Sequence, residues 1–421
     1  MSECTTVEDM IKIKPPDWGA FELKKILKEE KKPVPVIDEK KYKLISVKRR
    51  NGGISDRETL LGKNILTKKL NLLLPDTFLI AKMQISHGAC AYVPANISES
   101  YISDSYVSYK SSDTSILYLP YLNLLAQTKA LSNSFLRSSH GVHIEKMTFN
   151  PNDWLKNKIA LPSIVEQKKI TQILSSLDKV IRLSNLEIQK LTNLKKGMLQ
   201  QLLTKGIGHG DFKDSPVGKI PSSWSFDEIG NLINLDTEIT YGIVQAGPHV
   251  HNGVPYIKTG DMTGSDFDIS SLQKTSVEIA KKFKRSSVRE GDIVCAIRAI
   301  VGKVLVVPKA LNGANLTQGT AKISFRDEIG SRYGFWAMQS PFVEMQYKIV
   351  TKGTTFQEIT LADLRKIVIA IPPKQESNKL VKALDGVDTK LKLKLKKHNS
   401  LLFLKKGLMN DLLTGKVRAK I

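Results

Sequence analysis

Few residues in this sequence could perform chemistry, and their spacing fits none of the common catalytic motifs. The sequence contains no glycine-rich phosphate loop ending in Gly-Lys-Ser/Thr, no His-Glu-x-x-His and no paired Cys-x-x-Cys. It also lacks an Asn/Asp-Pro-Pro-Tyr/Phe run of the adenine methyltransferase type, because Pro15-Pro16 stands without the flanking residues. The sequence therefore predicts a chain without a catalytic centre of its own.

The histidines and cysteines offer weaker alternatives. His87, His140 and His143 could form a base or a metal cluster, but surface or DNA-facing histidines are the more common interpretation. Asp76 follows Pro75 without the Glu-x-Lys partner of a nuclease site, so a turn that enters a strand is favoured. The three cysteines are odd in number and lack metal-type spacing, which predicts a reducing cytoplasm without disulfides or zinc.

Loops rich in cations, amides and hydroxyls are the better candidates for function. Phosphates attract cations, and base edges are read by amide and guanidinium groups, so such loops predict contact with DNA. The glycines beside several of them allow close backbone approach. The candidates in the second half of the chain are Tyr241, Gln245, Lys258, Arg298, Lys303, Lys352, Thr354, Thr355 and Gln357. Those in the first half are Lys48, Arg49, Arg50, Asn51, Lys82, Gln84, Arg137 and His140.

The overall charge points to the same kind of partner. The 421 residues include 64 Lys+Arg and 41 Asp+Glu, a net charge of 64 − 41 = +23. With 41% hydrophobic residues the chain can form ordinary cores, so the excess charge must lie on surfaces. The most apolar stretch, residues 293–307, is interrupted by Arg298 and Lys303 and is too short to span a membrane. A polyanion such as nucleic acid is the expected partner.

The elements that must position these loops appear as an internal repeat. A shift of 210 residues aligns residues 159–204 with 369–414 without a gap, and 16 of the 46 positions are identical. The identities include Pro162 with Pro372, Glu166 with Glu376 and Asp178 with Asp388. Gapless identity at such residues indicates duplication rather than two helices of similar composition.

Each repeated segment has apolar residues at helical spacing. A helix of about 40 residues is about 60 Å long at 1.5 Å per residue, so it needs a partner of equal length, which the second copy provides. In the run Leu391–Leu395, leucine and lysine alternate as they would in a strand. Because this run aligns with the helical first copy, we predict that it is helical. The expected seam residues of this antiparallel coiled coil are Ile170, Leu174, Leu177, Ile181, Leu191, Leu194, Leu380, Leu384, Val387, Leu391, Leu401 and Leu404.

The segments before the two helices are α+β domains that correspond loosely, with Trp18 matching Trp224. The expected fold is therefore α+β, with two similar strand-rich domains, two long helices and an internal pseudo-two-fold repeat. Expected strands include 77–83, 90–93, 101–109, 254–257, 292–298, 303–307 and 319–325, and expected helices 118–131 and 332–346. The predicted boundaries are 1–158 (domain 1), 159–205 (central helix), 206–223 (connector), 224–368 (domain 2) and 369–421 (C-terminal helix).

Several of these segments resemble a known family, the specificity subunits of type I restriction-modification systems. The similar runs are Ile159-Ala160-Leu161-Pro162 leading to Glu166-Gln167-Lys168-Lys169-Ile170, the connector from Gly210 to Pro221 with Trp224, and Ala314-Asn315-Leu316-Thr317-Gln318-Gly319 after Gly291-Asp292-Ile293. Domain 1 departs from the pattern, because Pro75-Asp76-Thr77-Phe78 stands where domain 2 has Glu290-Gly291-Asp292-Ile293.

The resemblance implies a non-catalytic subunit with two target recognition domains. Each would read one half of a split, asymmetric sequence in double-stranded DNA, at a spacing set by the coiled coil. It also implies two modification subunits that methylate adenine with S-adenosylmethionine, and restriction subunits that use ATP and Mg²⁺. No cofactor or metal is expected in this chain. A stand-alone, two-headed DNA-binding regulator is the alternative; it would purify alone, whereas a specificity subunit would co-purify with a methyltransferase.

Overall fold

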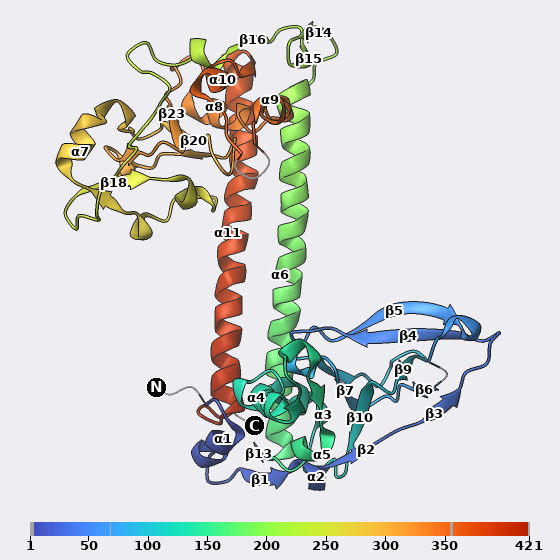
Figure 1. The fold of residues 1–421 in the computed structure, drawn as a ribbon. Coiled ribbons are helices and arrows are strands. Elements are labelled where there is room, and N and C mark those ends of the chain that lie inside the picture. Colours follow the sequence, from blue (N-terminus) through green and yellow to red (C-terminus); the bar gives the residue numbers. More distant parts are fainter. Residues whose placement is uncertain (1–3, 68, 354–356, 420–421) are drawn as a thin grey trace. The chain divides into compact units, whose positions relative to one another are not determined.

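The computed structural model describes residues 4–67, 69–353 and 357–419, which divide into two compact units. Unit 1 comprises Met1–Leu183 with His398–Ile421, and unit 2 comprises Ser184–Lys397. Each unit thus contains one strand-rich domain and a part of both long helices, α6 (Ile164–Lys205) and α11 (Lys374–Leu413). Figure 1 shows these helices in green and red.

Both long helices begin two residues after a proline that follows a strand: α6 begins at Ile164 after Pro162, and α11 at Lys374 after Pro372. Ile159 and Ile369, where helices were expected to begin, lie in strands β13 (Lys158–Leu161) and β24 (Val368–Ile371). Proline cannot donate to a ladder and restricts the residue before it, so Pro162 and Pro372 end these strands. At the start of α6, the hydroxyl of Ser163 accepts a hydrogen bond from the Glu166 amide at 3.3 Å.

The same strand pairing closes each domain. β1 (Gly19–Glu22) follows Trp18 and pairs antiparallel with β13, and β16 (Ser225–Glu228) follows Trp224 and pairs antiparallel with β24. Both tryptophans are buried, in the two largest core clusters. Each domain therefore begins and ends at the root of a long helix.

The central sheets of the two units also correspond. In unit 1 the four-stranded sheet has the order β2-β10-β7-β8, and in unit 2 the order is β17-β23-β20-β21. The strands of the first sheet are β2 (Leu27–Glu29), β10 (Tyr106–Ser111), β7 (Thr77–Ala81) and β8 (Cys90–Val93). Those of the second are β17 (Thr240–Tyr241), β23 (Thr320–Ile323), β20 (Ile293–Ala296) and β21 (Val304–Val306).

The remaining sheets distinguish the domains. Unit 1 adds a five-stranded sheet of order β3-β6-β9-β4-β5, and unit 2 a three-stranded sheet of order β19-β18-β22. The former contains β3 (Pro33–Pro35), β6 (Lys69–Leu72), β9 (Tyr101–Ser103), β4 (Lys41–Val47) and β5 (Ile54–Leu61). The latter contains β19 (Lys274–Thr275), β18 (Val254–Ile257) and β22 (Asn315–Leu316). Two-stranded pairs are β11 (Ser139–His140) with β12 (Thr148–Phe149), and β14 (Phe212–Ser215) with β15 (Gly218–Pro221).

Short helices cover these sheets, and two of the expected helices are each broken in two. The segment 118–131 forms α3 (Leu119–Leu125) and the start of α4 (Lys129–Arg137), because Thr128 caps a new helix. The segment 332–346 forms α8 (Ser331–Ala337) and α9 (Pro341–Val350), which Ser340 caps. The others are α1 (Val7–Ile13), α2 (Leu23–Ile26), α5 (Pro151–Trp154), α7 (Val277–Lys282) and α10 (Leu361–Arg365).

Within each unit α6 and α11 run antiparallel. In unit 2, Lys195 Nζ lies 2.6 Å from Asp388 Oδ1, and Glu187 pairs with Lys394 further along both helices. In unit 1, Lys405 Nζ lies 2.6 Å from Asp178 Oδ1. The pairs 195–388 and 405–178 are related by the 210-residue shift, so the repeat duplicates an ion pair as well as a fold.

The less exposed positions on both helices alternate at spacings of four and three residues, as in a coiled-coil seam. Ile170, Leu174, Leu380 and Leu384 are fully buried, and Leu177, Ile181, Leu191, Val387, Leu391 and Leu401 are partly buried. The expectation for Leu194 and Leu404 was wrong, because they are 50% and 49% exposed. Their neighbours Lys195 and Lys405 occupy the seam, where each finds an aspartate on the other helix.

Each long helix carries a glutamate in its first turn, and this glutamate is bound by a residue just beyond the C-terminal end of the other helix. In unit 1, the Arg418 guanidinium binds Glu166 through Nε at 2.9 Å and a terminal nitrogen at 2.7 Å. In unit 2, the ring Nε2 of His209 lies 2.8 Å from Glu376, and the Trp224 indole donates to it at 3.0 Å. Burial raises the pKa of Glu376, but the Ile207 amide, His209 and Trp224 outweigh it and lower that pKa.

In the described part of the chain, no helix is both long and apolar enough to cross a membrane.

Candidate nucleic-acid interface

In domain 1, the first group of candidates lies at the tip of the β4–β5 hairpin. Arg50 and Asn51 adopt positive φ angles of 57° and 54°, as a tight hairpin turn requires. Their backbone amides donate to His87 O at 2.7 Å and Gly88 O at 2.9 Å. The tip is therefore tied to the turn between β7 and β8, which carries the candidates Lys82 and Gln84.

The side chains of Arg49 and Gln84 bind each other. Arg49 Nε donates to Gln84 Oε1 at 2.6 Å, and its guanidinium lies 3.1 Å from Glu145. The Phe149 amide donates to Lys82 O at 3.0 Å. The structure thus brings together three segments that the sequence separates by up to 100 residues: 48–51, 82–84 and 145–149. Arg50 and Lys48 are exposed at this tip.

Arg137 and His140 have intramolecular partners. Arg137 lies 3.4 Å from Glu8 of α1, and His140 Nε2 lies 3.1 Å from Asp153. His87 lies 3.2 Å from Glu145, so two of the three histidines considered for a metal cluster face single carboxylates. Throughout residues 4–67, 69–353 and 357–419, no three His, Cys, Asp or Glu side chains form a group that could hold a metal.

In domain 2, the segment with Tyr241 and Gln245 passes close to the strand end that carries Gly319. At Gly242, a Cβ would lie 1.9 Å from Leu316 O, so only glycine fits there. The Ile243 amide donates to Leu316 O at 2.7 Å, which holds the segment in place. Tyr241 and Gln245 are exposed on either side of this contact.

Gly319 also marks the meeting point of Lys258 and Arg298. The hydroxyl of Thr259, next to Lys258, donates to Gly319 O at 3.1 Å, and the Ile297 amide donates to the same oxygen at 3.0 Å. Lys258 Nζ donates to Gln273 Oε1 at 3.3 Å. Contacts to the backbone of residues 316–319 therefore bring the 241–245, 258–259 and 297–298 segments together.

Arg298 links this group to the last candidate loop. Its Nε lies 3.2 Å from Glu358, whose backbone pairs with Lys352. The Ala299 amide donates to Gln357 O at 2.9 Å, and Ala299 has a positive φ of 63°. Arg298, Lys352 and Gln357 thus lie together. Thr354 and Thr355 lie outside the described residues.

Lys303 belongs to a different surface of domain 2. Burial lowers its pKa, and the nearby charge of Lys195 on α6 lowers it further. The other charged groups around it are Asp266, Asp388 and Lys392. Lys303 therefore lies toward the long helices, although the sequence grouped it with Lys258 and Arg298.

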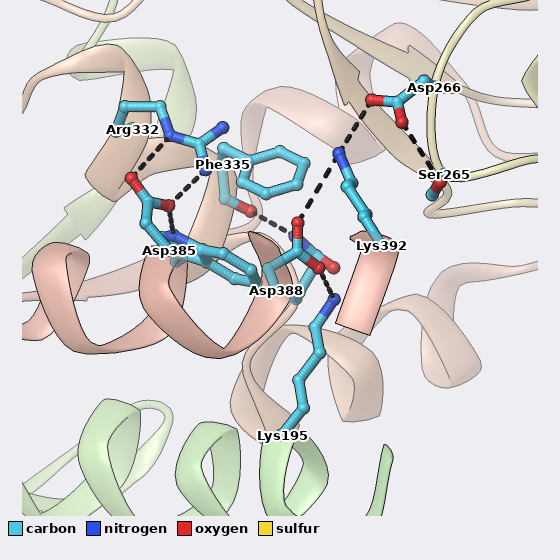
Figure 2. A network of polar contacts seen from close by, with 10 residues as sticks. Lys195, Ser265, Asp266, Arg332, Phe335, Asp385, Asp388 and Lys392 are labelled. Carbon is cyan, nitrogen blue, oxygen red and sulfur yellow. Dashed lines mark hydrogen bonds and ion pairs between the residues drawn. The ribbon is translucent and has the colours of Figure 1, made fainter. Parts of the chain in front are cut away.

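Sequence reasoning missed the residues that attach domain 2 to α11 (Figure 2). Asp385 of α11 accepts from Arg332 Nε at 3.2 Å and from the Trp336 indole at 2.8 Å. Lys392 Nζ lies 2.7 Å from Asp266. In the sequence, the repeat identified Asp178 and Asp388 as equivalent residues. These aspartates pair with lysines in the seam between the helices, so they did not predict how domain 2 attaches to α11.

The comparisons with known proteins agree with this architecture. A family model described as the type I restriction modification DNA specificity domain matches residues 15–193 and again residues 221–402. The putative type I restriction enzyme MjaX specificity subunit of Methanocaldococcus jannaschii is 31% identical over 66% of this chain and 63% of its own length. The EcoBI specificity subunit of Escherichia coli is 25% identical over 54% of this chain and 50% of its own length.

Solved structures show the same fold at lower identity. The S subunit of a type I restriction-modification system from M. genitalium has a TM-score of 0.60 at 14% identity and covers 94% of this chain and 96% of its own. A chain from a study of complex assembly in the type I system has a TM-score of 0.54 at 17% identity, covering 96% of this chain and 99% of its own. Since the family model matches both halves, this chain belongs to the type I restriction modification DNA specificity family and carries two copies of its domain.

Proposed function

We propose that the chain is the DNA sequence-specificity subunit of a type I restriction-modification complex. Each domain reads one half of a split, asymmetric DNA target, and the long helices set the spacing. The observation that carries this proposal is the duplicated fold with unlike recognition loops. The equivalent four-stranded sheets carry Lys82 after β7 in domain 1, but Tyr241 in β17 and Arg298 after β20 in domain 2. Domain 1 also presents Lys48–Asn51 from its additional five-stranded sheet. Different loops on one repeated frame fit two different half-sites.

The catalytic steps are proposed to lie in partner subunits. Two modification subunits would methylate an adenine with S-adenosylmethionine, and restriction subunits would use ATP and Mg²⁺, all in the cytoplasm. Apolar side chains on the outer faces of the long helices support docking of such partners. Val180 and Phe403 are exposed in unit 1, and Leu186 and Leu393 in unit 2. Contiguous exposed apolar patches mark protein–protein contact sites, and these side chains are among those from which α6 and α11 could form such patches.

Co-expression with the modification subunit tests this proposal. The chain should co-purify with that subunit, and only the complex should transfer methyl groups to DNA. A chain that stays alone and binds one target tightly would support the stand-alone regulator instead. Robust methyl transfer by the pure chain would refute its non-catalytic role.

The tip of the β4–β5 hairpin yields a separate prediction. Arg50→Ala removes an exposed cation, so DNA affinity should fall about equally for all sequences, and the slope of log K against log salt should become shallower by about one. Titration of a labelled duplex at several salt concentrations measures both. Lys156→Ala is the matched control, because Lys156 is exposed in the same domain but bound to Asp153 at 2.9 Å. In this variant the slope of log K against log salt should stay unchanged. An unchanged slope in Arg50→Ala would remove the tip from the DNA interface.

A further inference from the structure

The carboxylate of Asp385 is one of the groups that join domain 2 to the side of α11. It accepts from both Nε and a terminal nitrogen of Arg332 and from the indole of Trp336, which lies one turn further along α8. The guanidinium lies 4.8 Å from the centre of the Phe335 ring, and Trp336 is fully buried. Two-point binding of a planar guanidinium fixes an angle as well as a distance.

A second contact, about two turns along the same helix, limits rotation about the first. Lys392 Nζ lies 2.7 Å from Asp266, which belongs to a loop of domain 2 far from α8 in sequence. It also lies 3.6 Å from Asp388, which binds Lys195 of α6. Lys195 in turn lies 5.0 Å from the centre of the Trp336 ring. Domain 2 also packs against Leu380 and Leu384 of α11, and Lys374 at the start of that helix donates to Asp327 O. The contacts of Asp385 and Lys392 add two polar attachments further along α11, next to Lys195 of α6 (Figure 2).

Unit 1 keeps the seam ion pair but lacks the attachment. Helices α3 and α8 align at a shift of 212, which matches the buried Tyr121 with Tyr333 and the cap Thr128 with Ser340. At this alignment Pro120 replaces Arg332 and Leu124 replaces Trp336, and Ser175 replaces Asp385 at a shift of 210. Domain 1 instead meets its helix near the first turn, where Gln167 accepts from the Tyr118 amide at 2.9 Å and donates to Ile116 O at 2.7 Å.

We propose that Asp385 is a positioning residue, which fixes the angle of domain 2 on the helix pair and thereby the spacing at which its half-site is accepted. This inference rests on the proposed function. One base pair advances DNA by about 3.4 Å and turns it by roughly one tenth of a circle. A tilt that moves the DNA-reading loops of a recognition domain by a few ångströms therefore changes the accepted spacer by one base pair. Asp385 binds Arg332 and Trp336, neither of which is a candidate DNA contact, so the bases read should not change.

The test assembles each variant with the modification subunits and compares methylation of DNA with the preferred spacer and with spacers one base pair longer and shorter. Asp385→Ser, the residue that unit 1 has, should reduce the preference for the native spacer about tenfold and leave both half-site sequences unchanged. Arg332→Ala should behave alike. The exchange Arg332→Asp with Asp385→Arg should restore most of the preference. Glu344→Gln breaks an exposed pair with Lys348 on α9 and serves as the control, with an unchanged preference.

A second readout does not depend on DNA. Spin labels at Met345 of α9 and Lys390 of α11, in a Cys4→Ser background, should give one narrow distance distribution that Asp385→Ser broadens. The positioning role would be overturned if the wild-type complex is active but the distance distribution or the spacer preference stays unaltered in both Asp385→Ser and Arg332→Ala. The proposed function would not be affected by that result. A wild-type complex that methylates no split motif would instead overturn the proposed function.

Discussion

Replacing residues 14–150 with the equivalent domain of a relative should change one half of the methylated motif and leave the other half unaltered. The two domains have separate cores, and each closes on its own strand pair, β1 with β13 or β16 with β24. Each altered base pair is worth about 1–3 kcal/mol, roughly additively, so a half-site of three changed pairs corresponds to a preference of roughly a hundredfold or more.

Mapping methylated adenines in cells that express the chimera with the modification subunits measures this effect. The reciprocal chimera, with residues 224–368 exchanged, is the matched control and should change the other half. Changes in both halves after one exchange would show that the domains read DNA jointly, contrary to the modular arrangement.

The second large effect is expected at the root of α6. Arg418→Ala should lower the free energy of unfolding of unit 1 by about 3–5 kcal/mol, because it leaves the charge of Glu166 buried without a cation. Glu166 is 1% exposed, and Arg418 also binds Asp17 through two contacts of 2.8 and 2.7 Å. For a unit of this size the loss corresponds to a melting temperature lower by roughly 6–20 °C.

Calorimetry or thermal melting followed by circular dichroism measures this difference. Arg137→Ala removes an exposed arginine from a 3.4 Å pair with Glu8 in the same unit, and it should cost less than about 1 kcal/mol. Adding Glu166→Gln to Arg418→Ala should recover part of the loss, because no unpaired charge is then buried. Equal small effects for Arg418→Ala and Arg137→Ala would show that the contacts of Arg418 with Glu166 and Asp17 do not stabilise unit 1.

Much of the fold followed from the sequence because the chain repeats itself. The strand-like run Leu391–Leu395 lies within α11, as its alignment with the first copy predicted. Strands Cys90–Val93 and Val254–Ile257 were predicted with their observed bounds. The expectation of one strand over 101–109 was wrong, since β9 and β10 are separated by a turn at 104–105. A short polar turn between apolar residues is easily overlooked when period two continues on both sides.

The seam and the attachments depended on long-range charge, which local periodicity does not encode. Leu194 and Lys195 are both compatible with a helical stripe, and only the position of Asp388 on the other helix places the lysine in the seam. Likewise, nothing near Arg418 in sequence predicts its contact with Glu166, which lies 252 residues earlier. The repeat marked Glu166 and Glu376 as a pair, but their different partners, Arg418 and His209, lie outside the identical positions.

The central claim is that one chain reads two different half-sites. The most direct test is methylome sequencing of cells that express this chain with its modification subunits. The expected result is one split motif, with an unspecified spacer and one methylated adenine in each half. A continuous motif, or an unaltered methylome although the complex has formed, would contradict it.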